Sequence, residues 1–161
     1  MRRLVLALAI VAVTLLTSSC GVSGLAFRQD DRLSFVTPHD RSKVTLPVTV
    51  QWQVEDFDVG EGAGSFAVFV DRPPQPPGKP LDWLARDDDS CRPTDGCPDE
   101  HWYAEHDVYR MTDVRLTLDR LPARTDDRRE WHEVTVVLMD EHGRRVGETG
   151  WTLEFQVERE R

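Results

Sequence analysis

The sequence predicts an all-β protein, a sandwich of two sheets built from about seven antiparallel strands, and three observations lead to this fold class. Apolar and polar residues alternate at period two in several short segments, as in strands with one face in a core and one in water. Turns containing glycine separate neighbouring segments. No segment carries the apolar stripe of period 3.6 that an amphipathic helix needs.

The first predicted strands lie in the N-terminal half of the chain. Leu33, Phe35 and Val36 predict a short strand that ends before Pro38. Strict alternation predicts one long strand over 44–55, with an apolar face made of Val44, Leu46, Val48, Val50, Trp52 and Val54. Proline cannot donate to a neighbouring strand, so we expect this strand to lie at an edge or to bulge at Pro47.

Four further strands follow. Residues 66–70 are all apolar, so we expect both faces of that strand to be covered. Alternation predicts strands over 114–118, 134–138 and 151–157, and the glycine-containing segment 140–144 predicts a hairpin turn between the last two. Trp52 and Trp151 fall on inward faces. Only 83–84 and 102–103 are expected to form a short helical turn.

The last of these strands carry a resemblance to a known fold. The segment resembles the closing half of bacterial immunoglobulin-like and fibronectin-like domains, although the glycine usual just before His132 is missing. The residues that carry it are Leu116, Leu118, Leu121, Pro122, His132, Val134, Val136, Leu138, Asp140 and Gly143. The resemblance implies a single immunoglobulin-like β-sandwich over 32–161 and an adhesive or accessory role, without a catalytic residue.

The N-terminus has the pattern of an export signal. Arg2 and Arg3 precede an apolar run over 4–16, and small residues lead directly into Cys20. This segment resembles the lipobox of bacterial lipoproteins, although Thr17 stands where leucine is usual. The resemblance implies a signal peptide over 1–19, a lipidated Cys20, a tether over 20–31 and attachment to the extracytoplasmic face of a membrane. The alternative is an ordinary secretory signal with an incidental cysteine.

Composition narrows the range of partners. Without residues 1–19 the chain keeps 142 residues, which is enough for one domain. It then carries 18 basic and 29 acidic residues, a net charge of −11. Such a charge argues against nucleic acid and against electrostatic adhesion to anionic lipid, so the acylated Cys20 must supply the contact with membrane lipid.

The two remaining cysteines predict a disulfide. Cys91 and Cys97 form an even pair in an exported protein, and the bridge would close a small loop worth about 2 kcal/mol in chain entropy. A metal pair is the alternative, but it lacks a second cysteine or histidine pair at zinc spacing. Five intervening residues exclude a redox C-x-x-C motif.

The predicted bridge lies in an insertion over 71–109 that opens with a proline-rich segment, 72–80. We expect this segment to be a stiff polyproline connector crossing between the sheets, or else a ligand for a proline-recognising partner. Acidic residues surround the bridge, and Asp87, Asp89 and Asp95 are weak candidates for calcium, although their spacing does not match a D-x-D-x-D-G loop. The segment 100–106 misses both zinc-hydrolase motifs.

These observations lead to a non-catalytic function without a cofactor. We expect a binding or accessory role towards an unknown envelope protein, with the insertion as the contact surface because insertions on a rigid sandwich often carry function. Trp83, Asp99, Trp102 and Tyr103 are the expected interaction residues. Three alternatives remain open: an insertion that only covers a sheet, a calcium- or small-ligand-binding lipoprotein, and a small envelope hydrolase with paired carboxylates.

Overall fold

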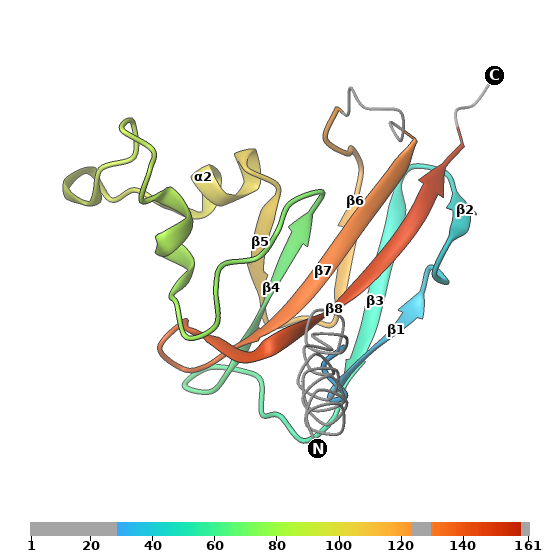
Figure 1. Cartoon of the computed structure of the whole chain (residues 1–161), viewed down its shortest axis with the longest axis horizontal. Helices are drawn as coiled ribbons and strands as arrows, with labels where there is room; N and C mark the ends of the chain where they lie inside the picture. Colours follow the sequence, from blue (N-terminus) through green and yellow to red (C-terminus); the bar gives the residue numbers. More distant parts are fainter. Residues whose placement is uncertain (1–28, 124–129, 159–161) are drawn as a thin grey trace, which may run out of the picture.

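The computed structural model of the chain describes residues 29–123 and 130–158, and in this part the protein is mostly strands arranged in two sheets (Figure 1). The two sheets pack face to face. Their facing side chains form one continuous apolar cluster that includes Val50 and Trp52 from one sheet and Phe66, Val136 and Phe155 from the other. The all-β prediction is confirmed.

The smaller sheet has three antiparallel strands in the order β1–β3–β6. In β3 and β6 the inward apolar residues alternate with polar residues that are exposed or half-buried, as the sequence predicts. The bounds are Leu33–Thr37 for β1, Val48–Val54 for β3 and Arg115–Leu118 for β6.

The larger sheet has five strands in the order β2–β8–β7–β4–β5, antiparallel except for the pair β2 and β8. The hairpin between β7 and β8 is confirmed: Asp140 Oδ1 accepts hydrogen bonds from the backbone N–H groups of His142 and Arg144. The bounds are Ser42–Val44 for β2, Ser65–Val70 for β4, Val108–Met111 for β5, Trp131–Met139 for β7 and Arg145–Val157 for β8.

The single long strand expected over 44–55 is wrong. The chain breaks at 45–47 and changes sheets there, because β2 pairs with β8 whereas β3 pairs with β1 and β6. The alternation continues across the break because Val44 and Val48 both pack against the core between the sheets, although they approach it from opposite sides. Pro47, which has no N–H, lies in the crossing segment.

Strand β4 has both faces buried, as its unbroken apolar sequence predicts. Phe66, Val68 and Val70 point into the core between the sheets. Ala67 and Phe69 point to the outer face, where they belong to a second apolar cluster. The larger sheet therefore needs a cover on each face.

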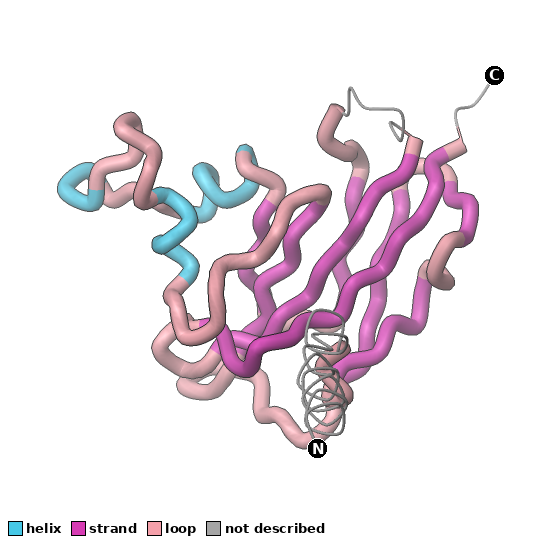
Figure 2. Tube along the Cα trace, viewed as in Figure 1, coloured by secondary structure: helices cyan, strands magenta, loops and turns pink. Residues whose placement is uncertain are grey.

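The helical segments are short and lie in the insertion (Figure 2). The turns expected at 83–84 and 102–103 are confirmed as the 3₁₀ turn η1, Leu81–Ala85, and the helix α2, Glu100–Glu105. A further 3₁₀ turn, η2, spans Pro93–Asp95. The expected end of the insertion at 109 is corrected, because β5 begins at Val108 and brings the number of described strands to eight.

Candidate functional site

The insertion is a lobe of residues 71–107 that leaves the larger sheet at the end of β4 and returns to it at β5 (Figure 1). Because β4 and β5 are neighbours in that sheet, the lobe starts and ends on one side of the sandwich. The expected crossing between sheets is therefore wrong, and the proline-rich connector stays with the larger sheet.

A second hydrophobic core joins the lobe to the outer face of the larger sheet. Trp102 and Tyr103 are only 8% and 7% exposed. This burial removes both residues from the expected contact surface. The lobe contributes Leu81, Ala85, Cys91, Trp102 and Tyr103, and the sheet contributes Ala67, Phe69, Val108, Val137 and Met139.

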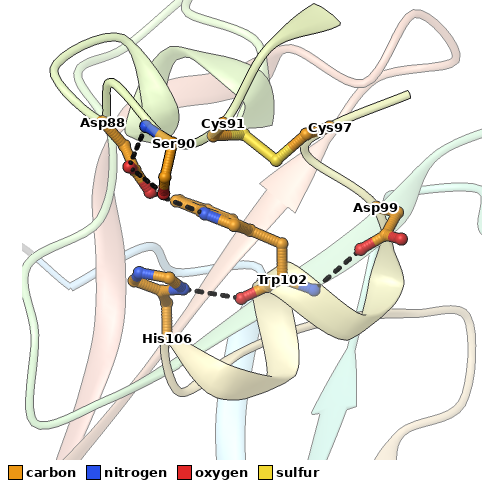
Figure 3. The surroundings of a disulfide bond; sticks show 7 residues. All are labelled: Asp88, Ser90, Cys91, Cys97, Asp99, Trp102 and His106. Atoms are coloured by element: carbon orange, nitrogen blue, oxygen red, sulfur yellow. Dashed lines mark hydrogen bonds between the residues drawn. A yellow bond between two sulfur atoms is a disulfide. The ribbon is translucent and has the colours of Figure 1, made fainter. Parts of the chain in front are cut away.

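The disulfide predicted between Cys91 and Cys97 is present, with an S–S distance of 2.02 Å (Figure 3). Cys91 is buried in the second core, whereas Cys97 packs against its margin. The bridge therefore ties the loop that contains η2 to the apolar base of the lobe.

Asp88 holds Trp102 in the second core (Figure 3). The Trp102 indole N–H donates to Asp88 Oδ2 at 2.9 Å, and Asp88 Oδ1 accepts from the Ser90 hydroxyl at 2.6 Å and the Ser90 N–H at 2.9 Å. The bond from the Ser90 hydroxyl, then that from the Trp102 indole, and then that from the Ser90 N–H lower the pKa of Asp88 to about 2. Both oxygens of this carboxylate are engaged, so the middle aspartate of 87–89 has a structural role.

The helix α2 is fixed at both ends. Asp99 caps its N-terminus by accepting the Trp102 backbone N–H at 2.8 Å. At the other end the His106 ring stacks on Trp102 at 3.9 Å, and its Nδ1 lies 2.7 Å from the Trp102 carbonyl oxygen (Figure 3). A carbonyl oxygen can only accept, so Nδ1 carries the proton in this contact. Asp99 is thus a cap, with its side chain directed to the helix.

Metal ligands do not converge in the lobe. His101 pairs with Glu105 at 3.3 Å on the exposed side of α2, while His106 turns towards Trp102. Within residues 29–123 and 130–158 no group of three His, Cys, Asp or Glu side chains could hold a metal ion. Asp87, Asp89 and Asp95 are exposed.

The proline-rich segment is pinned to the hairpin between β7 and β8. The buried Arg145 guanidinium donates to the Gln75 carbonyl oxygen at 2.6 Å and to the Glu148 carbonyl oxygen at 3.0 Å. Gln75 is fully buried, and its Nε2 approaches Met139 Sδ at 3.3 Å. Backbone hydrogen bonds join Gly78 and Lys79 to Arg145. The segment is therefore a packed strap along the sheet.

The exposed rim of the lobe has two features that the second core does not use. The Arg86 guanidinium lies over the Trp83 ring, 3.4 Å from its centre, and pairs with Asp87 at 2.7 Å. Asp87, Asp89 and Asp95 occupy exposed positions of the same lobe. Over 71–107 the chain carries ten acidic and four basic residues, so the lobe holds a net −6. We call Trp83, Arg86, Asp87, Asp89 and Asp95 the lobe rim.

A buried Asp–His pair lies where the lobe leaves the sheet. His132 Nδ1 is 2.6 Å from Asp71 Oδ2, and both side chains are more than nine-tenths buried. Asp71 Oδ1 also accepts the Glu133 N–H at 2.9 Å, which joins the end of β4 to the start of β7. An open cavity of about 290 Å³ adjoins the pair, and Arg72, Pro73, Trp131, Glu133 and Glu154 complete its lining.

The described lining of this cavity holds no hydroxyl, thiol or amine nucleophile. None of its described lining residues is Ser, Thr, Cys or Lys, and Asp71, Trp131, Glu133 and Glu154 have further interaction partners. A Ser–His–Asp type of hydrolysis needs a hydroxyl or thiol within reach of the histidine. The geometry supports a structural pin between two strands. Sequence reasoning missed it because Asp71 and His132 are 61 residues apart and belong to no local motif.

The predicted export signal and lipid anchor concern residues that the structure does not describe. Cys20 and the apolar run 4–16 lie outside the described residues. Of the helices that the structure describes, none is long and apolar enough to cross a membrane.

No family model matches the chain, and no curated protein is similar to it.

Proposed function

We propose that this chain is a bacterial lipoprotein, anchored through an acylated Cys20 on the extracytoplasmic face of a membrane, whose immunoglobulin-like domain binds a partner protein through the lobe rim without catalysing a reaction. The main support is that different residues of the lobe face the sheet and the solvent. Buried side chains hold it rigidly on the sheet, and an aromatic–arginine stack with acidic neighbours is left at its surface.

Strand order supports the immunoglobulin-like part of this proposal. The order β8–β7–β4–β5 corresponds to the G–F–C–C′ strands of variable-type domains, and β1–β3–β6 corresponds to A–B–E. One departure concerns the buried tryptophan. Trp52 lies on β3, the counterpart of strand B, whereas antibody domains carry their core tryptophan on strand C.

The composition of the rim supports a protein partner. Tryptophan and arginine are the residue types most enriched among those that dominate binding energy, and Trp83 and Arg86 are already held in one geometry. Pre-organisation lowers the entropy cost of binding. The net −6 of the lobe favours a partner surface of opposite charge and disfavours anionic lipid.

Site-directed photocrosslinking in native membranes tests the docking role. A photoreactive residue at position 83 should capture one defined protein, and Arg86→Gln should abolish the capture. The matched controls carry the photoreactive residue at position 43 or the Arg41→Gln change, on the opposite edge of the larger sheet. Equal capture from positions 83 and 43, or no effect of Arg86→Gln, would contradict docking through the rim.

Fractionation tests the anchor separately. The Cys20→Ala form should move from the membrane fraction to the soluble one, whereas a Cys91→Ala/Cys97→Ala form should stay with the membrane because its lipidation site is intact. Retention of the Cys20→Ala form after a high-salt wash would overturn lipid anchoring and leave the docking proposal standing.

A further inference from the structure

A second cavity, of about 210 Å³, lies between the lobe and the outer face of the larger sheet. It is distinct from the lobe rim and from the cavity beside His132. Its walls come from four parts of the chain: η1, α2, β5 and the β7–β8 hairpin. The lining residues that matter here are Leu81, Asp82, Tyr103, Arg110, Met139 and His142.

Three polar side chains of this cavity lack a protein partner. In the described part of the chain, Asp82, Tyr103 and Arg110 make no side-chain hydrogen bond and no ion pair, even with one another. Asp82 and Arg110 are exposed at the mouth, whereas Tyr103 is 7% exposed. The Tyr103 ring is buried, but its hydroxyl is not among the buried atoms that lack a partner, so it is accessible from the cavity and can donate to a ligand.

The Tyr103 hydroxyl keeps its proton at every physiological pH. Burial is the main cause, and the nearby Asp82 and Glu100 add to it, so the pKa of Tyr103 rises to about 12. The phenol therefore donates a hydrogen bond next to the Arg110 guanidinium, which also only donates. These two donors together suit a carboxylate.

The cavity also has a negatively charged side chain, Asp82. Asp82 can accept from an ammonium group, and because Asp82 and Arg110 form no ion pair with each other, each charge is available to a ligand. Leu81 and Met139 supply apolar wall, and both belong to the second core. The cavity is open to solvent, and its volume equals that of about seven water molecules, which suits a small ligand.

We propose that this cavity binds a free α-amino acid with an apolar side chain. Arg110 and Tyr103 hold its carboxylate, Asp82 holds its ammonium group, and Leu81 with Met139 contacts its side chain. His142, exposed in the hairpin turn, stands at the entrance. The site uses none of the rim residues, so it does not depend on the docking role proposed above.

The first test is a titration of the full domain by NMR with four probes: L-leucine, N-acetyl-L-leucine, L-leucinamide and O-phosphoethanolamine. Leucine should shift the resonances of the cavity residues. The acetylated probe lacks the ammonium and the amide lacks the carboxylate, so each should bind at least about tenfold more weakly. Equal affinity for all leucine derivatives, or binding of O-phosphoethanolamine in preference to leucine, would overturn the assignment.

The second test measures whether Asp82 binds the ammonium group of leucine and whether Arg110 and Tyr103 bind its carboxylate. Asp82→Asn should weaken leucine about tenfold and remove the preference for leucine over its acetylated form. Arg110→Gln should also weaken leucine about tenfold, and it should remove the preference for leucine over leucinamide. Tyr103→Phe should weaken leucine while leaving the melting temperature nearly unchanged, because only a hydroxyl is lost. The controls are Asp113→Asn and Arg115→Gln, two exposed changes outside the cavity.

These variants separate binding from folding. A merely structural role would lower the melting temperature and reduce all probes alike, whereas the proposal requires selective losses at an unchanged fold. The site would be refuted if all three cavity variants bound leucine as tightly as the two control variants do. Such a result would leave capture of a partner at position 83 unaffected, so failure of this site and failure of the docking role are distinguishable.

Discussion

The two faces of the larger sheet are covered in different ways. The inner face meets a second sheet, and the contact is a continuous cluster of alternating apolar side chains. The outer face meets an irregular lobe with two 3₁₀ turns and one short helix. That cover depends on a disulfide and on polar contacts such as Asp88 to Trp102 and Arg145 to Gln75.

The difference shows what regular structure supplies. A paired strand satisfies its own backbone groups, so a second sheet covers a face with apolar side chains alone. An irregular segment must find partners for its N–H and C=O groups elsewhere. The cross-link, the helix cap and the buried arginine meet those needs in the lobe, and the exposed residues left over are available for binding.

Two phenylalanines on the same strand give the sharpest comparison and the largest expected effect. Phe66 faces the inner core and Phe69 the outer one, and both are 0% exposed. Each change to alanine should lower the free energy of unfolding by about 3–5 kcal/mol, measured by urea denaturation. Val36→Ala, at an exposed position, is the control. A loss below about 1 kcal/mol for Phe69→Ala would mean that the lobe does not form a second core.

Removal of the disulfide should affect only one of the two faces. The Cys91→Ala/Cys97→Ala form should lose about 2 kcal/mol, because the loop it closes is short. Hydrogen exchange should accelerate in 81–107 and stay slow in β7 and β3. Equal acceleration in both regions would show that the lobe and the sandwich unfold as one cooperative unit.

Asp88→Asn should loosen the lobe without a measurable effect on the sandwich. The two carboxylate oxygens of Asp88 accept from Ser90 and from Trp102, whereas an asparagine amide is uncharged and has only one accepting oxygen. We therefore expect the indole N–H resonance of Trp102 to move and the lobe amides to exchange faster. Asp89→Asn changes an exposed neighbour and is the matched control. Identical spectra for the two variants would remove Asp88 from its anchoring role.

Acid should reproduce the effect of that substitution. The folded-state pKa of Asp88 lies at about 2, below the unfolded value of about 3.9, so its contribution is complete above the unfolded value. The contribution is lost as the pH falls from about 4 towards 2. The Trp102 indole resonance followed over this range should report the loss, and a midpoint near 4 would contradict the hydrogen bonds assigned to Asp88.

The smallest effect concerns Tyr103 in strong base. Its folded-state pKa of about 12 exceeds the unfolded value of about 10, so the unfolded chain releases its proton first. Stability should therefore fall as the pH rises from about 10 to 12. Absorbance of tyrosinate should show this ionisation in the wild type, and Tyr103→Phe should leave only that of Tyr109. Ionisation of Tyr103 near 10 would contradict its burial.

Local pattern predicted the elements better than their partners. Alternation located β1, β3 and β6–β8, an unbroken apolar run located β4, and the Asp–Gly turn located the hairpin between β7 and β8. It missed β5, whose Val108 to Met111 segment alternates over only four residues. Alternation also predicted β2 and β3 as one strand. The pattern shows which side of the chain is apolar, but it does not show that the chain changes sheets.

The candidate residues were predicted less well for a related reason. Trp102, Tyr103 and Asp99 were expected at a contact surface, and the structure uses them as core and cap. An aromatic residue in a loop has the same sequence signal whether it faces a partner or folds back onto a sheet. Tyr103, Asp82 and Arg110 meet at one cavity from three separate elements, so no spacing in the chain could have brought them together.

The all-β class, most of the strands and the pairing of Cys91 with Cys97 can be predicted from the sequence, because each depends on residues close together in the chain. The sheet that each strand joins, the closure of the outer face by the lobe, and the polar side chains left for a ligand become known only from the folded chain. Those outcomes depend on burial by distant segments, since a side chain becomes core or surface only when another part of the chain reaches it.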